Sequence, residues 1–372
     1  MVKLAMSWSR EIHKLPLGTR YIGLLPKGCT LCHEGLKLVL FITGLCNRRC
    51  WYCPISDLRR GKDVIYANEV RINDIRDIIP HINLMEAKGT GITGGEPLLV
   101  FDRVIKVIEL LKAEFGEEHH IHLYTNGELL SLNHACALKE CGLDELRIHI
   151  TSELSWKGIK NAINAGLNVG IEIPVIPNNG LNYYTNIIRR AESMGIRFIN
   201  LNELELSESN YMALRIRGLT PRDDIPYAVK GSEELALSIL EWASRNVHNI
   251  NLHYCPARVK DAIQLKFRLK RVSCKVAKTH EVVDDDGLIV KGILESNINL
   301  QTLKGVLSRT IGERNVFVRN GKTIEFNVNY LDKVIDLLNS FPTILRNTRV
   351  YIIRVHPITH MIFEKIPVTV KR

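Results

Sequence analysis

Apolar and polar positions follow two alternating patterns between residue 38 and about residue 206. Short, nearly continuous apolar runs predict strands covered on both faces, because a half-exposed strand would alternate apolar and polar side chains. The longer stretches between them place apolar residues three and four positions apart, which predicts helices with one buried face. The predicted strands span residues 38–43, 90–93, 120–124, 145–150, 169–175 and 198–204.

Strands that alternate with helices predict consecutive βαβ units and therefore a parallel sheet. Two α/β architectures fit this pattern equally well, a partial (β/α)6 TIM-like barrel and an open doubly wound sheet. In either of them the functional side chains belong at the carboxyl ends of the strands.

The pattern changes after residue 206, where a helix and a short strand complete the core. Further on, two hairpins, a helix and a strand predict a small α+β domain, and the second hairpin turns at Asn320-Gly321. We therefore expect four parts: an N-terminal extension with a Cys-x-x-Cys pair (1–37), the core (38–256), a basic helix with candidate metal ligands (257–280) and the C-terminal domain (281–372).

Composition is that of a soluble globular protein, with 45% hydrophobic and 24% charged residues in 372. No apolar run is long enough to cross a bilayer, and the N-terminus lacks the features of a signal peptide, so we expect a cytoplasmic protein and no membrane partner. Glutamine occurs only at Gln264 and Gln301, a scarcity typical of heat-adapted proteins such as those of thermophilic archaea.

Three cysteines follow the first predicted core strand, in the stretch LVLFITGLCNRRCWYC: Cys46, Cys50 and Cys53. In a reducing compartment such a cluster predicts metal binding rather than disulfides. A structural zinc site usually has four protein ligands, whereas three thiolates leave one coordination position of a metal centre open. An open position is typical of a catalytic site, and a cubane held by three cysteines has one iron free.

The spacing Cys46-x3-Cys50-x2-Cys53, with Tyr52 before the last cysteine, resembles the signature of the radical S-adenosylmethionine (SAM) superfamily. The stretch GITGGEP (91–97) is similar to that superfamily's Gly-Gly-Glu motif. The stretch LYTNG (123–127) resembles the third strand of enzymes of the pyruvate formate-lyase-activating type, and RIHITS (147–152) matches a ribose-contacting position. VGIEIPVIP (169–177) departs from the superfamily's adenine-contacting pattern. The resemblance covers residues 38–206 and favours the barrel.

The resemblance implies that Cys46, Cys50 and Cys53 hold a [4Fe–4S] cluster whose open iron binds SAM. An electron from a ferredoxin- or flavodoxin-type donor would then cleave SAM to a 5′-deoxyadenosyl radical, which abstracts hydrogen from a protein, peptide or small molecule. In this reading, Gly94 and Gly95 let the backbone approach the ligand, and Glu96 accepts hydrogen bonds from the SAM ammonium group. The implied SAM-binding residues are Tyr52, Thr93, Gly94, Gly95, Glu96, Asn126 and Ser152.

Four further cysteines flank the core and could form one additional site. Cys29 and Cys32 form a Gly-bounded Cys-x-x-Cys pair before the first core strand, and Cys255 and Cys274 follow the last one. These four thiols predict a second metal centre, either an auxiliary [4Fe–4S] cluster or a structural zinc ion. Unrelated buried thiols are the alternative interpretation.

Net charge is +10, and residues 258–278 contain eight basic residues against one acidic residue, Asp261. A solvated helix face usually explains such a run, but it also fits a nucleic-acid footprint. Two alternatives to the main interpretation are therefore an RNA-modifying radical SAM enzyme and a non-catalytic iron–sulfur or zinc protein. The histidines at 119, 120 and 122 lie at a strand start, away from the expected site, and we interpret them as surface residues.

Overall fold

The computed structural model describes residues 9–369 except 320, 322, 342, 343, 345 and 346. The chain divides into two compact units, one ending at Gln264 and the other beginning at Leu265. The division falls inside the basic segment at 257–280. The two units are described separately below.

Seven parallel strands form the centre of the sheet in the first unit, and their order in the sheet is their order in the chain. A doubly wound sheet would reverse its strand order at a switch point, so the unbroken order identifies the partial barrel. The expected α/β fold is confirmed, and the short strand predicted after residue 206 joins the first six as the seventh parallel strand. The parallel strands are β3 (Lys37–Phe41), β6 (Gly89–Thr93), β7 (His120–Thr125), β8 (Glu145–Ile148), β9 (Val169–Val175), β10 (Phe198–Glu203) and β11 (Asn251–Cys255).

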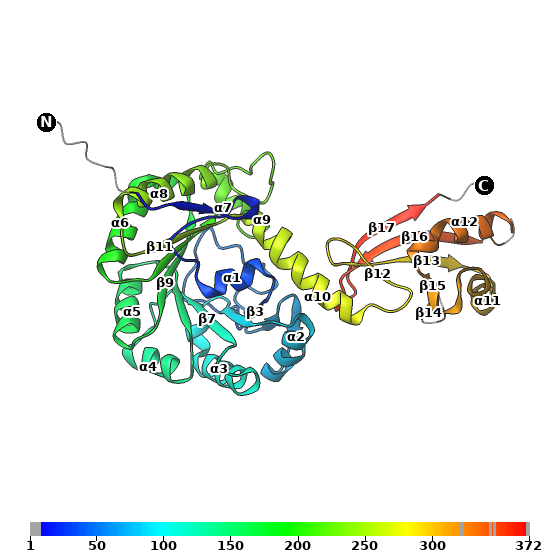
Figure 1. Cartoon of the computed structure of the whole chain (residues 1–372), viewed down its shortest axis with the longest axis horizontal. Coiled ribbons are helices and arrows are strands. Elements are labelled where there is room, and N and C mark those ends of the chain that lie inside the picture. Colours follow the sequence, from blue (N-terminus) through cyan, green and yellow to red (C-terminus); the bar gives the residue numbers. More distant parts are fainter. Residues whose placement is uncertain (1–8, 320, 322, 342–343, 345–346, 370–372) are drawn as a thin grey trace. The chain divides into compact units, whose positions relative to one another are not determined.

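Helices cover the outer face of this sheet, whereas α1 (Lys27–His33) lies on the inner face and packs against β3, β6 and β7 (Figure 1). The outer helices bury the apolar stripe that the sequence predicts; in α6, for example, Ile187, Ile188 and Ala191 are buried. The remaining helices of the unit are α2 (Ile78–Met85), α3 (Phe101–Phe115), α4 (Leu132–Glu140), α5 (Glu153–Asn164), α6 (Gly180–Ser193), α7 (Tyr211–Ile216), α8 (Ser232–Asn246) and α9 (Ala257–Val259), followed by a π-helical turn at Lys260–Leu265.

Short antiparallel strands extend the sheet at both ends. Next to β11 lie β2 (Arg20–Ile22) and then β1 (Ile12–Lys14), and next to β3 lie β4 (Ile65–Ala67) and then β5 (Val70–Ile72). Residues of the predicted N-terminal extension thus contribute two strands and an inner helix to the barrel unit.

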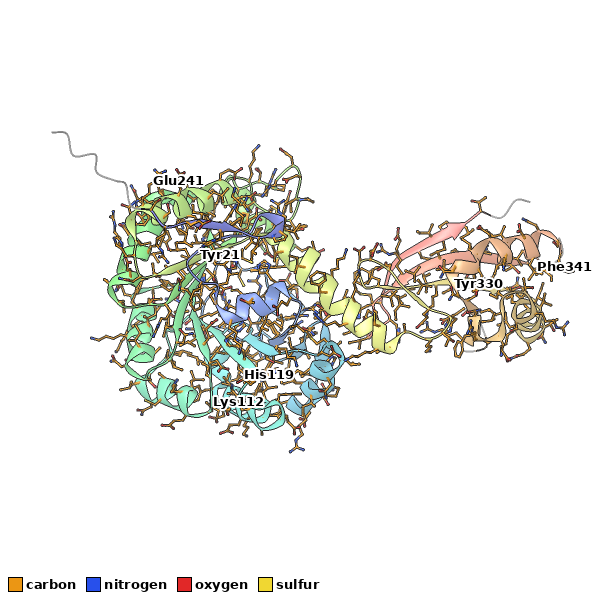
Figure 2. The ribbon with its side chains drawn as sticks, in the orientation of Figure 1. Tyr21, Lys112, His119, Glu241, Tyr330 and Phe341 are labelled. Atoms are coloured by element: carbon orange, nitrogen blue, oxygen red, sulfur yellow. The ribbon has the colours of Figure 1, made fainter. Side chains whose placement is uncertain are left out.

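The histidines at the start of β7 are buried, so their interpretation as surface residues is wrong. The exposed fractions of His119, His120 and His122 are 3%, 5% and 0%. His119 shares a 2.9 Å hydrogen bond with the hydroxyl of Thr90. The amine of Lys112 donates to the His119 carbonyl, and both residues are labelled in Figure 2. β7 lies in the middle of the sheet between β6 and β8, and α1 packs against it.

The second unit begins with α10 (Lys266–Val276) and contains an antiparallel sheet in the order β14-β15-β13-β16-β17, with β12 paired to β13. Both predicted hairpins are present, although Asn320 of the second turn lies outside the described residues. No helix in the described part of the chain has the length and apolar composition needed to cross a bilayer. The elements are β12 (Val282–Val283), β13 (Ile289–Ser296), α11 (Leu300–Ile311), β14 (Val316–Arg319), β15 (Thr323–Phe326), α12 (Leu331–Asn339), β16 (Thr348–Val355) and β17 (Ile362–Val368).

Candidate active site

The three clustered cysteines lie on the long loop that connects β3 to β4. Cys46 is exposed, Cys50 and Cys53 are half-buried, and all three line one cavity of about 520 Å³. Partial burial raises the pKa of the Cys50 thiol, so this thiol would release its proton on binding a metal. The sequence therefore places three potential thiolate ligands at the carboxyl end of a barrel strand, as expected.

Gly94 and Gly95 bring the end of β6 against the cysteine loop. The amide of Gly95 donates to the carbonyl of Thr43 over 2.8 Å, and the amide of Glu96 donates to the carbonyl of Leu45 over 2.7 Å. A Cβ at Gly95 would lie 2.2 Å from the Leu45 carbonyl oxygen. Both glycines line the cavity. The close contact that a side chain would block, however, is with the protein's own backbone in the cysteine loop.

We expect Gly95→Ala to weaken cluster retention, because the new Cβ must displace the backbone immediately before Cys46. Overpacking of this kind costs about 1–3 kcal/mol. Iron content and thermal stability of the reconstituted protein measure the effect. Gly305→Ala is the matched control, since an added Cβ there meets no atom within 4 Å. Equal iron retention in the two variants would contradict the expected role of the contact.

Glu96 is fully buried and braces the ends of β6 and β7. One carboxylate oxygen accepts from the Thr125 hydroxyl at 2.6 Å and from the Leu98 amide at 3.0 Å, and the other accepts from the Asn126 amide at 2.8 Å. Glu96 does not appear among the side chains that line the cavity, whereas Thr93, Thr125 and Asn126 do. This carboxylate therefore holds together two strand ends that carry cavity-lining groups.

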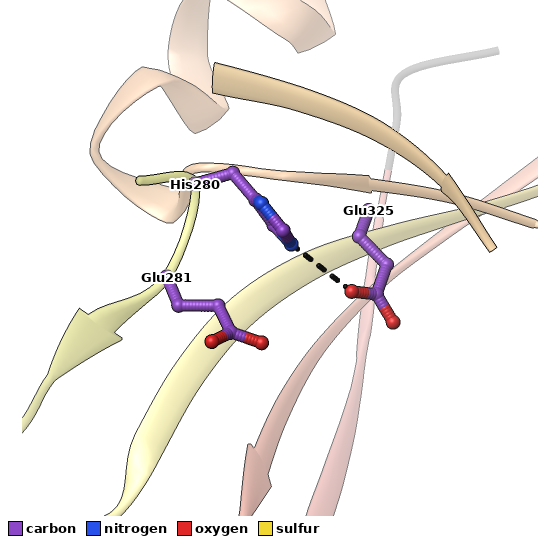
Figure 3. Close-up of side chains that lie close together, drawn as sticks. All are labelled: His280, Glu281 and Glu325. Carbon is purple, nitrogen blue, oxygen red and sulfur yellow. Dashed lines mark hydrogen bonds and ion pairs between the residues drawn. The ribbon is translucent and has the colours of Figure 1, made fainter. Parts of the chain in front are cut away.

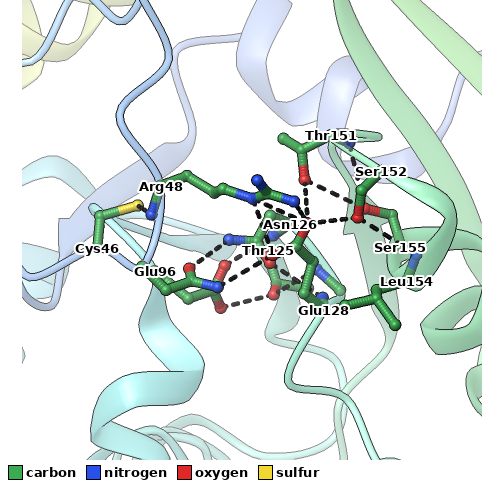
Figure 4. A network of polar contacts seen from close by, with 12 residues as sticks. Cys46, Arg48, Glu96, Thr125, Asn126, Glu128, Thr151, Ser152, Leu154 and Ser155 are labelled. Atoms are coloured by element: carbon green, nitrogen blue, oxygen red, sulfur yellow. Dashed lines mark hydrogen bonds and ion pairs between the residues drawn. The ribbon is translucent and has the colours of Figure 1, made fainter.

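An ion pair joins the cysteine loop to the end of β7 (Figure 4). Arg48 Nε donates to the Glu128 carboxylate at 2.9 Å, and the hydroxyls of Thr151 and Ser152 donate to the same carboxylate at 2.9 and 2.5 Å. Asn126 Nδ2 donates to the side-chain oxygen of Asn47 at 2.7 Å. Ser152 also caps α5, and its neighbour Thr151 lines the cavity.

The pH dependence of this clamp follows from the Glu128 pKa, which hydrogen bonding to Arg48 lowers to about 2. The pKa of Glu128 in the folded protein lies below the ordinary value of about 4.3. The ion pair with Arg48 therefore stabilises the fold fully above about pH 4.3, and this stabilisation disappears as the pH falls towards 2. We expect ¹³C NMR of the Glu128 carboxyl to show ionisation near pH 2. In an Arg48→Met variant the midpoint should rise, and an unchanged midpoint would contradict the clamp.

Tyr52 and His149 form a polar contact on the wall of the cavity. The Tyr52 hydroxyl lies 2.8 Å from His149 Nε2, and His149 Nδ1 lies 3.0 Å from the carbonyl oxygen of Glu172. Burial lowers the pKa of His149, which favours the neutral ring. This contact fixes the orientation of Tyr52, the aromatic residue next to Cys53.

Charged side chains that sequence reasoning missed lie inside the barrel. Arg147 is 1% exposed and binds Glu145 at 2.6 Å and Glu172 at 2.9 Å. Lys37 is 7% exposed and lines the same cavity as Arg147 and Glu172. The sequence did contain a signal for inward-facing charges, because the charged residues at 145 and 147 alternate with the apolar residues Leu146 and Ile148. In a barrel, such alternation places the charged side chains on the inner face.

The additional cysteines divide between the two units. Cys29 and Cys32 on α1 and Cys255 at the end of β11 all line the cavity, together with the cysteine triad. Cys274 is an exposed residue of α10 in the second unit. The first unit thus brings three of the four predicted auxiliary ligands to one cavity.

The second unit contains a buried polar cluster of His280, Glu281 and Glu325 whose potential ligand atoms lie within 4.8 Å of one another (Figure 3). The amine of Lys291 binds Glu281 at 2.7 Å and Glu325 at 2.9 Å, and Arg319 binds Glu325 at 3.0 Å. These cations already balance both carboxylates, so the cluster is an ion-pair network rather than a cation site.

Comparison with known proteins agrees with this geometry. Residues 40–153, which include the triad, the Gly-Gly-Glu stretch and the ends of β7 and β8, match the radical SAM superfamily. A protein of Methanocaldococcus jannaschii named as a glycyl-radical enzyme activating enzyme is 44% identical over 283 residues, 73% of each chain. Fold and relatives define an iron–sulfur enzyme that uses SAM. The chain belongs to the radical SAM superfamily, and its cofactors are a [4Fe–4S] cluster and SAM.

More distant relatives share only part of the chain. The GTP 3′,8-cyclase of Alkaliphilus oremlandii is 32% identical over 143 residues, which are 37% of this chain and 43% of the cyclase. The solved structure of anSMEcpe with bound AdoMet is 16% identical and covers 68% of this chain and 73% of its own, with a TM-score of 0.42.

Proposed function

We propose that Cys46, Cys50 and Cys53 hold the [4Fe–4S] cluster, and that SAM binds in the cavity between this loop and the ends of β6 to β8. The observation that carries the proposal is that all three thiols and the Gly94-Gly95 backbone border one cavity. When bound and reduced, the cluster and SAM supply a 5′-deoxyadenosyl radical, the hydrogen-abstracting species of the superfamily.

The donor set fits a cluster better than a single ion. Two sulfurs bound to one zinc ion at 2.3 Å lie at most about 4.6 Å apart. In the described part of the first unit, no three ligand atoms of His, Cys, Asp or Glu lie within 4.8 Å of one another. A cubane binds each thiolate through a different iron and therefore accommodates wider spacing.

The proposed SAM contacts divide into two groups. Tyr52, Thr93 and Asn126 line the cavity and are available to a ligand directly, as are the backbones of Gly94 and Gly95. Glu96 and Ser152 act indirectly. The Glu96 carboxylate holds the backbone of Asn126 in place, and the Ser152 hydroxyl holds the Glu128 carboxylate in place. We therefore assign these two residues to positioning the SAM site.

The proposed substrate is the backbone of a glycine in a partner protein, with an external ferredoxin- or flavodoxin-type reductant. This substrate class rests on the name of the M. jannaschii relative, which matches this chain over 73% of both lengths. Abstraction of a glycine Cα hydrogen would leave a glycyl radical on the partner.

A small polar molecule is the second candidate substrate. Lys37, Arg147 and Glu172 line the inner part of the cavity, and buried charges of both signs are suited to binding a compact, charged compound. An RNA substrate has less support. Four of the eight basic residues at 258–278 have carboxylate partners: Arg258 with Glu233, Lys260 with Glu205, Lys266 with Asp286 and Lys270 with Asp285.

The test uses reduced, anaerobically reconstituted protein with SAM and one of three probes: a glycyl-radical-type polypeptide labelled with [2-²H₂]glycine, GTP, or total RNA. We expect deuterium in the released 5′-deoxyadenosine only with the labelled polypeptide, measured by mass spectrometry. Stimulation by GTP without deuterium transfer would favour the small-molecule substrate. Stimulation by RNA that weakens steeply with salt would contradict the protein substrate.

A further inference from the structure

We propose that Cys29, Cys32 and Cys255 hold a second iron–sulfur cluster inside the barrel, in the cavity that the cysteine triad also lines. Cys29 and Cys32 lie three positions apart on α1, so both project from the same side of that helix. Cys255 is the last residue of β11. Three thiols from distant parts of the chain therefore converge on one internal space rather than on the packed core.

Side-chain donors surround two of these sulfurs. Arg147 Nη2 lies 3.4 Å from Cys29 Sγ, Asn200 Nδ2 lies 3.5 Å from the same atom, and Gln264 Nε2 donates to Cys32 Sγ. Hydrogen bonds to cysteine sulfur are one of the means by which proteins stabilise and tune iron–sulfur clusters. The donors come from β8, β10 and the segment after α9, so the barrel itself supplies the surroundings of the site.

Positive charge near the thiols favours an anionic occupant. Arg147 Nη2 lies 3.4 Å from Cys29 Sγ, and Lys37 and Lys260 line the same cavity, together with the carboxylate of Glu172. Lys37 is 7% exposed. A cation inside a buried cavity is costly unless an anion pairs with it, and an anionic cluster in the cavity would offset that cost.

Two histidine nitrogens beside the thiols support the proposal independently. His253, two residues before Cys255, is 3% exposed and lines the cavity, and its Nε2 atom has no hydrogen-bond partner in the described part of the chain. The Nε2 atom of His33, which follows Cys32 in the sequence, also has no hydrogen-bond partner in the described part of the chain. Buried polar atoms in native proteins nearly always have a partner in the protein, a ligand or water, and these two nitrogens belong to residues that line the cavity in which the cluster is proposed.

The spacing of the donors favours a cluster over zinc. As at the triad, no three of these sulfurs and ring nitrogens lie within 4.8 Å of one another, a limit that one tetrahedral ion would require. Apart from the triad and these three residues, no cysteine lines the cavity. The second cluster would thus have an iron without a cysteine ligand, open to a nitrogen or oxygen donor.

Iron and acid-labile sulfide, quantified after anaerobic reconstitution, test the proposal. Wild-type protein should bind about eight irons, two cubanes of four. The variant C46A/C50A/C53A should retain about four and show a cluster signal by EPR after reduction. The variant C29A/C32A/C255A should also retain about four, and the sixfold variant should retain none, which controls for adventitious iron.

Cys136→Ala and Cys274→Ala are matched controls, because neither residue lines the cavity, and both variants should keep about eight irons. The decisive sample is the triad variant, since its proposed second site is unaltered. If that variant bound no iron while wild type bound four, the second site would be overturned and the triad assignment would stand. Zinc in place of iron, or loss of the additional iron in Cys274→Ala, would equally overturn this three-cysteine cluster.

Discussion

Cys50→Ala is expected to abolish SAM cleavage and to remove the irons of one cubane from the reconstituted protein. Cys50 lies between Cys46 and Cys53 on the loop after β3, and two thiolates alone would have to hold a cluster that already lacks a fourth cysteine. Replacing outer-shell partners of metal ligands costs about 10–100-fold in affinity or activity, so loss of a ligand should cost more than about 100-fold.

The measurement is 5′-deoxyadenosine released under dithionite, with iron content determined on the same samples. Cys136→Ala is the matched control, because this half-buried thiol of α4 does not line the cavity. Circular dichroism establishes that both variants are folded. Retention of SAM cleavage by Cys50→Ala would show that the triad is not the ligand set.

The largest loss of stability is expected from Arg147→Met. Arg147 pairs with Glu145 and Glu172 inside the barrel, and removing it leaves buried carboxylates without their strongest partner. Breaking a buried ion pair costs about 3–5 kcal/mol. Denaturant unfolding followed by tryptophan fluorescence reports on the first unit, because all four tryptophans of the chain lie there.

Arg190→Met is the control, since Arg190 pairs with Glu153 at 2.7 Å on the surface and such pairs contribute little to stability.

The pH dependence of the stability lost in Arg147→Met also tests the ion pair between Arg147 and Glu172. Burial alone would raise the pKa of Glu172, but Arg147 and the side chains of Asn200 and Asn202 lower it to about 2. The ion pair of Glu172 therefore stabilises the fold above the ordinary glutamate pKa of about 4.3, and this stabilisation disappears as the pH falls towards 2. The difference between wild type and Arg147→Met should therefore narrow in acid, and a constant difference would contradict the pairing.

The pattern of the sequence was sufficient to predict the parallel strands and the residues at their carboxyl ends, because both depend on local patterns. Apolar runs alternating with helical periodicity indicated the strands and helices, whereas the choice of the barrel over a doubly wound sheet depended on the family resemblance. Closely spaced cysteines on one loop need no long-range information to be predicted as ligands.

Side-chain direction was harder to predict, because it depends on which elements meet in space. The approach of the Gly95 backbone to a ligand stays a prediction, but the close contact at its missing Cβ with the carbonyl of Leu45 could not be read from the sequence. The contact of Glu96 with SAM also stays a prediction, and the hydrogen bonds of its oxygens to groups of β7 depend on where the two strand ends meet. His122 fits between Gly28 and Gly91, where an added Cβ would lie 2.7 and 2.6 Å from the ring nitrogens, and no periodicity reports such a contact.

The position of α1 has a practical consequence for anyone seeking a minimal catalytic fragment. The superfamily match begins at residue 40, which invites truncation just before β3. Such a truncation would delete a helix seated on the inner wall and the edge strands β1 and β2, and so expose Lys37, His122 and Arg147 to bulk water. A fragment expected to keep this cavity closed to bulk water must therefore include β1 and the preceding Arg10, whose amide donates to the carbonyl of Ser244, well upstream of the signature motif.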